Sequence, residues 1–213
     1  MTSIAFIIIS LLSLLLLYLG VGKNKRLLLL FISWQFIVGF LAFFMVLVTH
    51  PKLFPILILG SFALTIYSLK RIDIKIINPR ILLAIHILRI PVELVLYQLF
   101  LLQKIPYLMT FKGWNFDILV GISALAISIY QIYTKSNINR QLFMIWNIIG
   151  IVFLFIIALI GILSSPLPIQ QFAFEQPNIA VLEFPYCFLP TCVVQIVLIS
   201  HILLLKWSFK QKS

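Results

Sequence analysis

Charged residues, and acidic ones above all, are scarce in this chain. Only 10% of the 213 residues are charged, and 5 Asp and Glu stand against 16 Lys and Arg. Soluble globular proteins carry about a quarter charged residues, so this composition excludes an ordinary soluble protein. The net charge of +11 would suggest nucleic acid in a soluble protein. Here the basic residues flank apolar segments, so we expect contact with the lipid bilayer and no nucleic-acid partner.

Cysteine is also rare, because Cys187 and Cys192 are the only two. Five residues apart on a continuous helix, they would point in different directions. A disulfide between them would need a helix break at Pro190. We therefore expect two packed free thiols.

Several catalytic and cofactor motifs are missing. The sequence has no Gly-rich phosphate-binding loop, no His-Glu-x-x-His zinc motif and no Gly-x-Ser-x-Gly elbow. The last apolar segment has a lysine only at its end, Lys206, which argues against a retinal Schiff base. Arg89 is the one arginine inside an apolar segment, so an arginine-rich voltage sensor is also unsupported. The sequence names no cofactor.

Long apolar segments dominate what is present. Hydrophobic residues make up 63% of the chain, and a bilayer core takes about 20 apolar residues as helix. We expect an all-α, polytopic transmembrane helical bundle of about seven spans, forming a single transmembrane domain over residues 1–213. Basic residues follow the first segment and do not precede it, so we read that segment as a retained helix and not as a signal peptide. The predicted spans are 3–21, 27–48, 53–69, 81–102, 116–133, 142–163 and 185–205.

Basic residues are distributed unevenly between the loops. Twelve lie in the first, third and fifth loops and the tail, and three lie in the second, fourth and sixth loops. Because cytoplasmic loops carry the excess of Lys and Arg, we expect an N-out, C-in orientation, in a bacterial cytoplasmic (inner) membrane. The twelve are Lys23, Lys25, Arg26, Lys70, Arg71, Lys75, Arg80, Lys135, Arg140, Lys206, Lys210 and Lys212; the three are Lys52, Lys104 and Lys112.

Arg89 and Glu93 lie near the middle of the fourth predicted span. A charge at that depth costs a few kcal/mol, so it is usually paired and functional. Their i, i+4 spacing predicts an ion pair on one helix face. Pro91 between them lacks an N–H group, which leaves the carbonyl of Ile87 free and predicts a kink. We expect a mid-membrane site here, although a structural pair that fixes helix register is the alternative.

Further polar residues extend this site toward both membrane faces. His86 and Tyr97 share one helix stripe with Arg89 and Glu93, and this stripe should face the bundle interior. Asn115 and Asp117, at the start of the fifth span, either cap that helix or close the outer mouth of the site. Glu183 lies in an apolar stretch before the last span, which makes it a candidate partner for Arg89. The predicted ligand-binding residues are Arg89, Glu93, Tyr97, Asn115, Asp117 and Glu183.

The long sixth loop, residues 164–184, contains several prolines and polar residues, and we expect it to cap the outer face or to be partly re-entrant.

Two histidines lie at matching depth. His86 is five residues into its span and His201 five residues before Lys206, so each lies about 8 Å inside the cytoplasmic boundary at about 1.5 Å per residue. This placement permits axial haem ligation or a shared metal. Trp146 and Asn147 lie at a similar depth and would suit ordinary interhelical hydrogen bonding instead. A proton relay is a third possibility.

Four functions fit these observations. The leading one is a small-solute or ion transporter or a receptor-like binder centred on Arg89 and Glu93, with Arg89 holding an anionic group and Glu93 exchanging a proton. The second is a membrane-embedded enzyme that acts on a lipid-like substrate, with acid and base groups from the outer acids and Asn115. The third is a bis-histidine haem protein, and the fourth is a structural subunit.

Overall fold

The computed structural model describes residues 2–210, and Lys212 of the basic tail lies outside them. The described residues form helices and short helical turns and contain no strand. The α-helices are α1 (Thr2–Gly20), α2 (Lys25–Phe43), α3 (Val46–Thr49), α4 (Phe54–Arg71), α5 (Pro79–Ile85), α6 (Arg89–Leu101), α7 (Asp117–Thr134), α8 (Arg140–Leu163) and α9 (Val194–Lys210). The short turns are η1 (Pro51–Leu53), η2 (His86–Leu88), η3 (Tyr107–Met109), η4 (Ala180–Leu182) and η5 (Leu189–Val193).

Seven of the helical segments described are long and apolar enough to cross a membrane, as the sequence predicted. These segments are Thr2–Gly20, Lys25–Phe43, Pro51–Arg71, Pro79–Leu101, Asp117–Thr134, Arg140–Leu163 and Leu189–Lys210. Each overlaps one predicted span. Such a bundle is compatible with a multi-pass membrane protein.

Three predicted boundaries were wrong by several residues, namely the end of the second span and both ends of the last span. The second span was expected to reach residue 48, but α2 ends at Phe43, and Met45 adopts a left-handed backbone conformation with φ 57°. The last span was expected over residues 185–205, but it begins at Leu189 and ends at Lys210. Pro190 then lies in the first turn, where a missing N–H group is tolerated.

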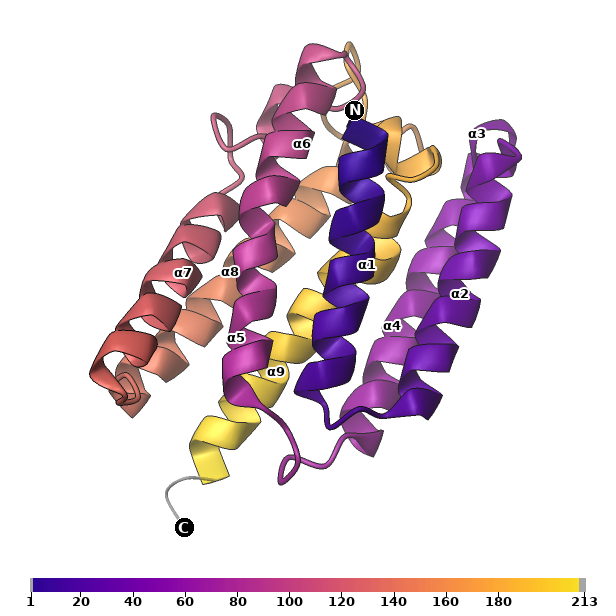
Figure 1. Ribbon diagram of the computed structural model, residues 1–213. Helices are drawn as coiled ribbons and strands as arrows, with labels where there is room; N and C mark the ends of the chain where they lie inside the picture. The colour runs from indigo at the N-terminus through magenta and orange to yellow at the C-terminus, as the bar shows by residue number, and fades with distance from the viewer. Residues whose placement is uncertain (1, 211–213) are drawn as a thin grey trace.

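Helix α9 is the centre of the bundle. It packs against α8, α5, α4 and α1, and Ile196, Ile199, Leu203 and Leu204 on it are fully buried. Figure 1 shows the other long helices standing around it, with α2 and α4 side by side at one edge. The N-terminus lies at one end of the bundle and the C-terminus at the other (Figure 1). We call these the N-terminal end and the C-terminal end.

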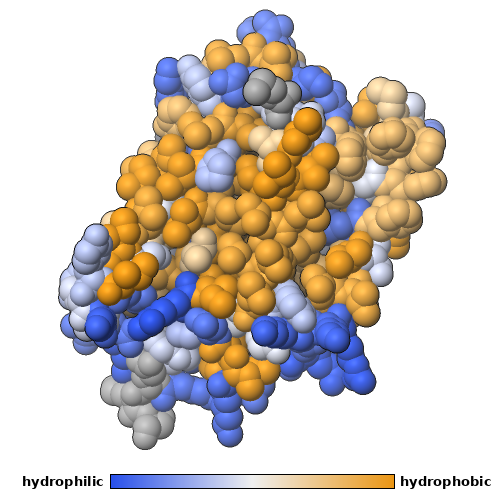
Figure 2. Space-filling model, viewed as in Figure 1, coloured by the Kyte–Doolittle hydropathy of each residue, from blue (hydrophilic) through white to orange (hydrophobic). Residues whose placement is uncertain are grey.

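The outside of the bundle is apolar along its middle. Figure 2 shows a broad hydrophobic band with hydrophilic residues gathered at both ends. On α2, for example, the side chains of Phe36, Phe40 and Phe43 are exposed. A continuous apolar surface of this extent is typical of a protein surrounded by lipid.

Polar side chains inside the bundle connect helices that lie far apart in the sequence. Trp34 of α2 donates its indole N–H to the Ser61 hydroxyl of α4 at 2.8 Å. The Thr65 hydroxyl of α4 donates to Oε1 of Gln195 on α9 at 2.8 Å. Gln35 of α2 donates through Nε2 to the carbonyl of Thr191 at 2.9 Å. Such interhelical bonds stabilise membrane bundles by about 0.6 kcal/mol on average.

The fourth span is interrupted, as Pro91 predicted. Helix α5 ends at Ile85, the 3₁₀ turn η2 follows, and α6 begins at Arg89. Because Pro91 cannot donate to Ile87, the chain tightens here, and the N–H of Arg89 bonds to the carbonyls of His86 and Ile87. This interruption lies at the level of the buried charges.

The sixth loop caps the N-terminal end of the bundle. Backbone N–H groups of Ile179 and Ala180 both donate to the carbonyl of Lys104 at 3.1 Å. Gln176 Nε2 reaches the carbonyls of Phe100 and Ile105 at 3.1 and 2.6 Å. The predicted cap is therefore present. Cys187 and Cys192 are both free and buried, as expected.

Candidate functional site

The guanidinium group of Arg89 is the centre of a buried polar network. Arg89 begins α6 and is only 3% exposed. Its Nη1 donates to Oδ1 of Asp117 on α7 at 2.8 Å. Its Nη2 lies 3.0 Å from Nε2 of His201 on α9. Because α6 meets α7 and α9 through these two contacts, the buried charge holds three helices together.

His201 has its proton placement fixed by these neighbours. Arginine can only donate, so Nε2 of His201 must be the acceptor and Nδ1 must carry the proton. Nδ1 then donates to Oδ1 of Asn147 on α8 at 2.9 Å. Asn147 in turn donates to the carbonyl of Phe143 at 2.8 Å. Of the two hydrogen-bond partners considered for the histidines, Asn147 is confirmed, whereas Trp146 donates to Ser123.

His86 lies against this network without joining it. Its ring faces that of His201, with centroids 3.9 Å apart and an interplanar angle of 33°. The ring of Trp146 meets the His86 ring edge-on, with the two ring centroids 5.3 Å apart. His86 is fully buried, and neither ring nitrogen has a hydrogen-bond partner among the described residues.

The haem and metal alternatives for His86 and His201 stay predictions. Both nitrogens of His201 are already engaged by Arg89 and Asn147. Among the residues that the structure describes, no group of three or more His, Cys, Asp or Glu side chains could hold a metal ion.

Glu93 lies one helical turn beyond Arg89 and contacts different partners. Its Oε1 accepts from Nδ2 of Asn115 at 2.6 Å. Asn115 also donates to the carbonyl of Met109 at 3.1 Å and accepts the N–H of Asp117 at 3.1 Å. The other carboxyl oxygen, Oε2, is buried and has no partner in the described part of the chain. Glu93 itself is 2% exposed.

The predicted Arg89–Glu93 ion pair was wrong. Arg89 pairs with Asp117 instead. In a helix, a base followed four residues later by an acid is the less favourable order, because both side chains lean toward the N-terminus and the dipole opposes the pair. Asp117 reaches Arg89 from a neighbouring helix and does not have this limitation.

Glu183 and Tyr97 do not pair with Arg89 or Glu93 and have other partners. Glu183 forms an ion pair with Lys104, so its predicted pairing with Arg89 was wrong. The loop carrying Glu183 lies at the N-terminal end, beside Lys104 and away from the buried arginine. Tyr97 accepts a hydrogen bond from Lys112 at 2.8 Å, and this bond raises the pKa of Lys112.

A cavity of about 100 Å³ adjoins Glu93. It is partly open, and residues of α4, α6, α8, α9 and the sixth loop line it. Most of these residues are apolar, such as Phe62, Leu96 and Ile157. Its polar residues are Glu93, Asn115, Asp117, Ser165, Asn178 and Gln195.

Three of the six predicted ligand-binding residues therefore meet at one cavity. These three are Glu93, Asn115 and Asp117. The structure does not bring Arg89, Tyr97 or Glu183 to the cavity wall. Sequence reasoning missed Asn178, whose Oδ1 is buried without a partner among the described residues. Asn178 lies in an irregular loop, where no periodicity shows which way a side chain points.

The fold and this site define an all-helical bundle with seven candidate membrane spans and a buried polar centre. The chain belongs to the family described as "Domain of unknown function (DUF8737)", whose model matches residues 46–208. The match includes every residue of the polar network and the cavity. Comparisons with curated proteins and with solved structures found no match.

The Arg89–Asp117 pair should show strong energetic coupling. Removing one partner of a buried ion pair costs about 3–5 kcal/mol, because the other charge remains buried alone. We expect this loss of unfolding free energy for Arg89→Met and for Asp117→Leu. The double variant should lose less than the sum of the two single losses. Unfolding by SDS in detergent micelles measures these free energies.

The partly exposed pair Lys104–Glu183, whose side chains are 35% and 28% exposed, is the matched control. Lys104→Met should change the unfolding free energy by at most about 1 kcal/mol. Strictly additive losses for Arg89→Met and Asp117→Leu would contradict the coupling.

Gly150 should be required for the position of His201. A Cβ at Gly150 would lie 2.4 Å from Cε1 of the His201 ring. Because both ring nitrogens are bonded, the ring cannot move aside freely, and we expect Gly150→Ala to destabilise by about 1–3 kcal/mol. Gly161→Ala on the same helix is the control, since the nearest atom to its Cβ would be the flexible end of Met109 at 3.3 Å, and Nδ2 of Asn178 would lie at an ordinary contact distance of 3.7 Å. Equal thermal stability of the two variants would contradict this role.

Proposed function

We propose that this protein is a multi-pass membrane protein that binds a small, mainly apolar molecule carrying an amine or hydroxyl group, as a receptor-like binder or a carrier. The observation that carries this proposal is the unpartnered Oε2 of Glu93, which is buried beside a mainly apolar cavity. A buried carboxyl oxygen without a hydrogen-bond partner is costly. A ligand that donates to it would remove that cost.

The free polar atoms around the cavity support a ligand with donors. Glu93 Oε2 can accept a hydrogen bond. Asn178 donates through Nδ2 to the carbonyl of Gly161 at 3.1 Å, so its unpartnered Oδ1 is an acceptor as well. Ser165 already uses its hydroxyl donor on Gly161, and Gln195 uses one of its two N–H donors on Pro190. The cavity therefore offers two unpartnered acceptor atoms against one free N–H of Gln195, which favours a ligand with donors over an anionic ligand.

The charge balance favours an amine over an alcohol. Arg89 is bonded to Asp117 and His201, so Glu93 has no cation in direct contact. An ammonium group at Oε2 would form a charge-assisted hydrogen bond, which is roughly twice as strong as a neutral one. The proposed amine site at Glu93 replaces the anion-binding role that the sequence suggested for Arg89.

The size and position of the cavity suit the end of a lipid-soluble molecule. An apolar cavity of about 150 Å³ holds one benzene, so about 100 Å³ accepts a small head with part of its body. Residues of α4 and of α8 line the cavity, and both helices pack against α9. We propose that the ligand enters from the lipid between α4 and α8.

We also propose the N-out, C-in orientation in a bacterial cytoplasmic membrane. The support is the charge bias, because the loops at the C-terminal end carry most of the basic residues. In this orientation the Glu93 cavity lies in the outer half of the membrane.

An enzyme acting on a lipid-like substrate is the second candidate. The observation that favours it is the presence of two carboxyl groups, Glu93 and Asp117, at one apolar cavity. It predicts that the purified protein changes the composition of a lipid extract and that Asp117→Asn abolishes this change.

The affinity for small aromatic probes should depend on the polar group that each probe carries. In lipid nanodiscs, we expect benzylamine to raise the unfolding midpoint most, benzyl alcohol less, and toluene and benzoate least. Glu93→Gln should weaken benzylamine binding about tenfold or more, because a hydrogen bond between charged groups is lost. Midpoints measured over a range of probe concentrations give the affinities.

Glu183→Gln is the control for this experiment, because it removes another glutamate that lies outside the cavity. It should bind benzylamine as the wild type does. A benzoate response as large as that of benzylamine, or equal responses from Glu93→Gln and wild type, would overturn the proposal.

The orientation predicts which loops a membrane-impermeant maleimide can reach in intact cells. A cysteine at exposed Gln171, in the sixth loop, should react at once. A cysteine at exposed Ser136, in the fifth loop, should react only after the cells are permeabilised. The wild type controls for the two buried native cysteines. The opposite pattern would reverse the orientation.

A further inference from the structure

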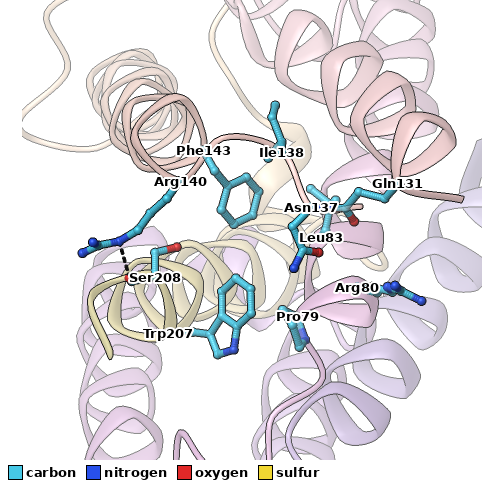
Figure 3. A pocket seen from close by; sticks show the side chains of 10 residues that line it. All are labelled: Pro79, Arg80, Leu83, Gln131, Asn137, Ile138, Arg140, Phe143, Trp207 and Ser208. Atoms are coloured by element: carbon cyan, nitrogen blue, oxygen red, sulfur yellow. Dashed lines mark hydrogen bonds between the residues drawn. The ribbon is translucent and has the colours of Figure 1, made fainter. Parts of the chain in front are cut away.

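A second, smaller cavity lies at the C-terminal end of the bundle, apart from Glu93. Its volume is about 30 Å³, which is room for about two waters. The starts of α5 and α8 and the ends of α7 and α9 surround it (Figure 3). Pro79, Leu83 and Phe143 form its apolar wall.

The polar side chains around this cavity are rich in N–H donors. Arg80, Gln131, Asn137, Arg140 and Trp207 line it, and no Asp or Glu lies among its lining residues. Figure 3 shows the two arginines on opposite sides of the cavity, with both guanidinium groups directed away from its centre. This is the reverse of the acceptor-rich cavity at Glu93.

Most of these donors are unused within the described residues. Gln131 is 9% exposed, yet its side chain makes no hydrogen bond with the rest of the described chain. Arg140 uses only Nε, which donates to the carbonyl of Ser208 at 2.7 Å (Figure 3). Its terminal nitrogens therefore stay available. A side chain that is this far buried and has no partner in the protein is available to a water molecule or a ligand in the cavity.

The charge around the cavity favours an anion. The ion pairs of the described residues are Arg89–Asp117 and Lys104–Glu183, so Arg80 and Arg140 are both uncompensated. In the loops at this end, Asp73 is the sole acid among many Lys and Arg residues. Arginine pairs at the membrane surface, beside a tryptophan, suit a phosphate group.

We propose that this cavity binds a phosphate group, with buried Gln131 donating from the cavity wall, exposed Asn137 donating from the rim, and Arg80 and Arg140 turning toward the phosphate from both sides. The small volume admits phosphate oxygens while the remainder of the molecule stays at the mouth. The phosphate belongs either to an anionic lipid headgroup or to a soluble phosphate. This site is independent of the ligand proposed for Glu93.

Native mass spectrometry of the full-length protein in detergent tests this site. The probes are phosphatidylglycerol and diacylglycerol with identical acyl chains, and inorganic phosphate. Wild type should bind phosphatidylglycerol at least tenfold more tightly than diacylglycerol. Gln131→Glu places a negative charge in the cavity and should reduce phosphatidylglycerol binding at least tenfold.

Gln141→Glu is the matched control, because it adds the same charge at an exposed position at the same end. It should reduce binding no more than threefold. A second comparison uses exposed residues, whose substitution does not disturb the core. Arg80→Gln should reduce phosphatidylglycerol binding more than Lys135→Gln does. Equal effects within each pair would show a general surface attraction and overturn the site. Diacylglycerol binding as tight as that of phosphatidylglycerol would also overturn it.

Competition with inorganic phosphate shows whether the bound phosphate group belongs to a lipid or to a soluble molecule. If it displaces phosphatidylglycerol from wild type and stabilises wild type but not Gln131→Glu against heat, the site takes a soluble phosphate. If phosphatidylglycerol binding persists in excess phosphate and still depends on Gln131, the site takes a lipid headgroup.

Discussion

The burial of Arg89 is the constraint on which the rest of the bundle depends. A guanidinium group that is 3% exposed is tolerated inside an apolar bundle only with bonded partners. Asp117 and His201 supply them from two other helices, and Asn147 fixes His201 from a fourth. The interruption at η2 places Arg89 at the start of α6, and the absence of a side chain at Gly150 leaves room for the His201 ring.

The same constraint leaves Glu93 available. Because Asp117 occupies Arg89, the carboxyl group of Glu93 is held only by Asn115 and faces a mainly apolar cavity. The bundle thus carries an acceptor-rich cavity in its N-terminal half and a donor-rich cavity at its C-terminal end. This separation parallels the charge bias of the loops, with acids gathered toward one end and bases toward the other.

Sequence patterns predicted the fold well and the site in part. Hydropathy located all seven helices because apolar run length is a local property, and Pro91 predicted the interruption of the fourth. The mid-span charges located the polar centre. Periodicity along one helix suggested the Arg89–Glu93 pair, but the actual partner comes from another helix, whose rotation depends on packing. Asn178 lies in an irregular loop, so only tertiary structure could place it at the cavity.

The most direct test of the central claim measures the distance from Glu93 to a bound amine. The chain has three glutamates, so protein labelled with ¹³C at the glutamate carboxyl carbons and incubated with ¹⁵N-benzylamine gives few signals in solid-state NMR. We expect dipolar dephasing of one carboxyl signal by the amine nitrogen, and loss of that signal in Glu93→Gln. Dephasing that persists in Glu93→Gln, or that is absent from the wild type under saturating benzylamine, would contradict the account.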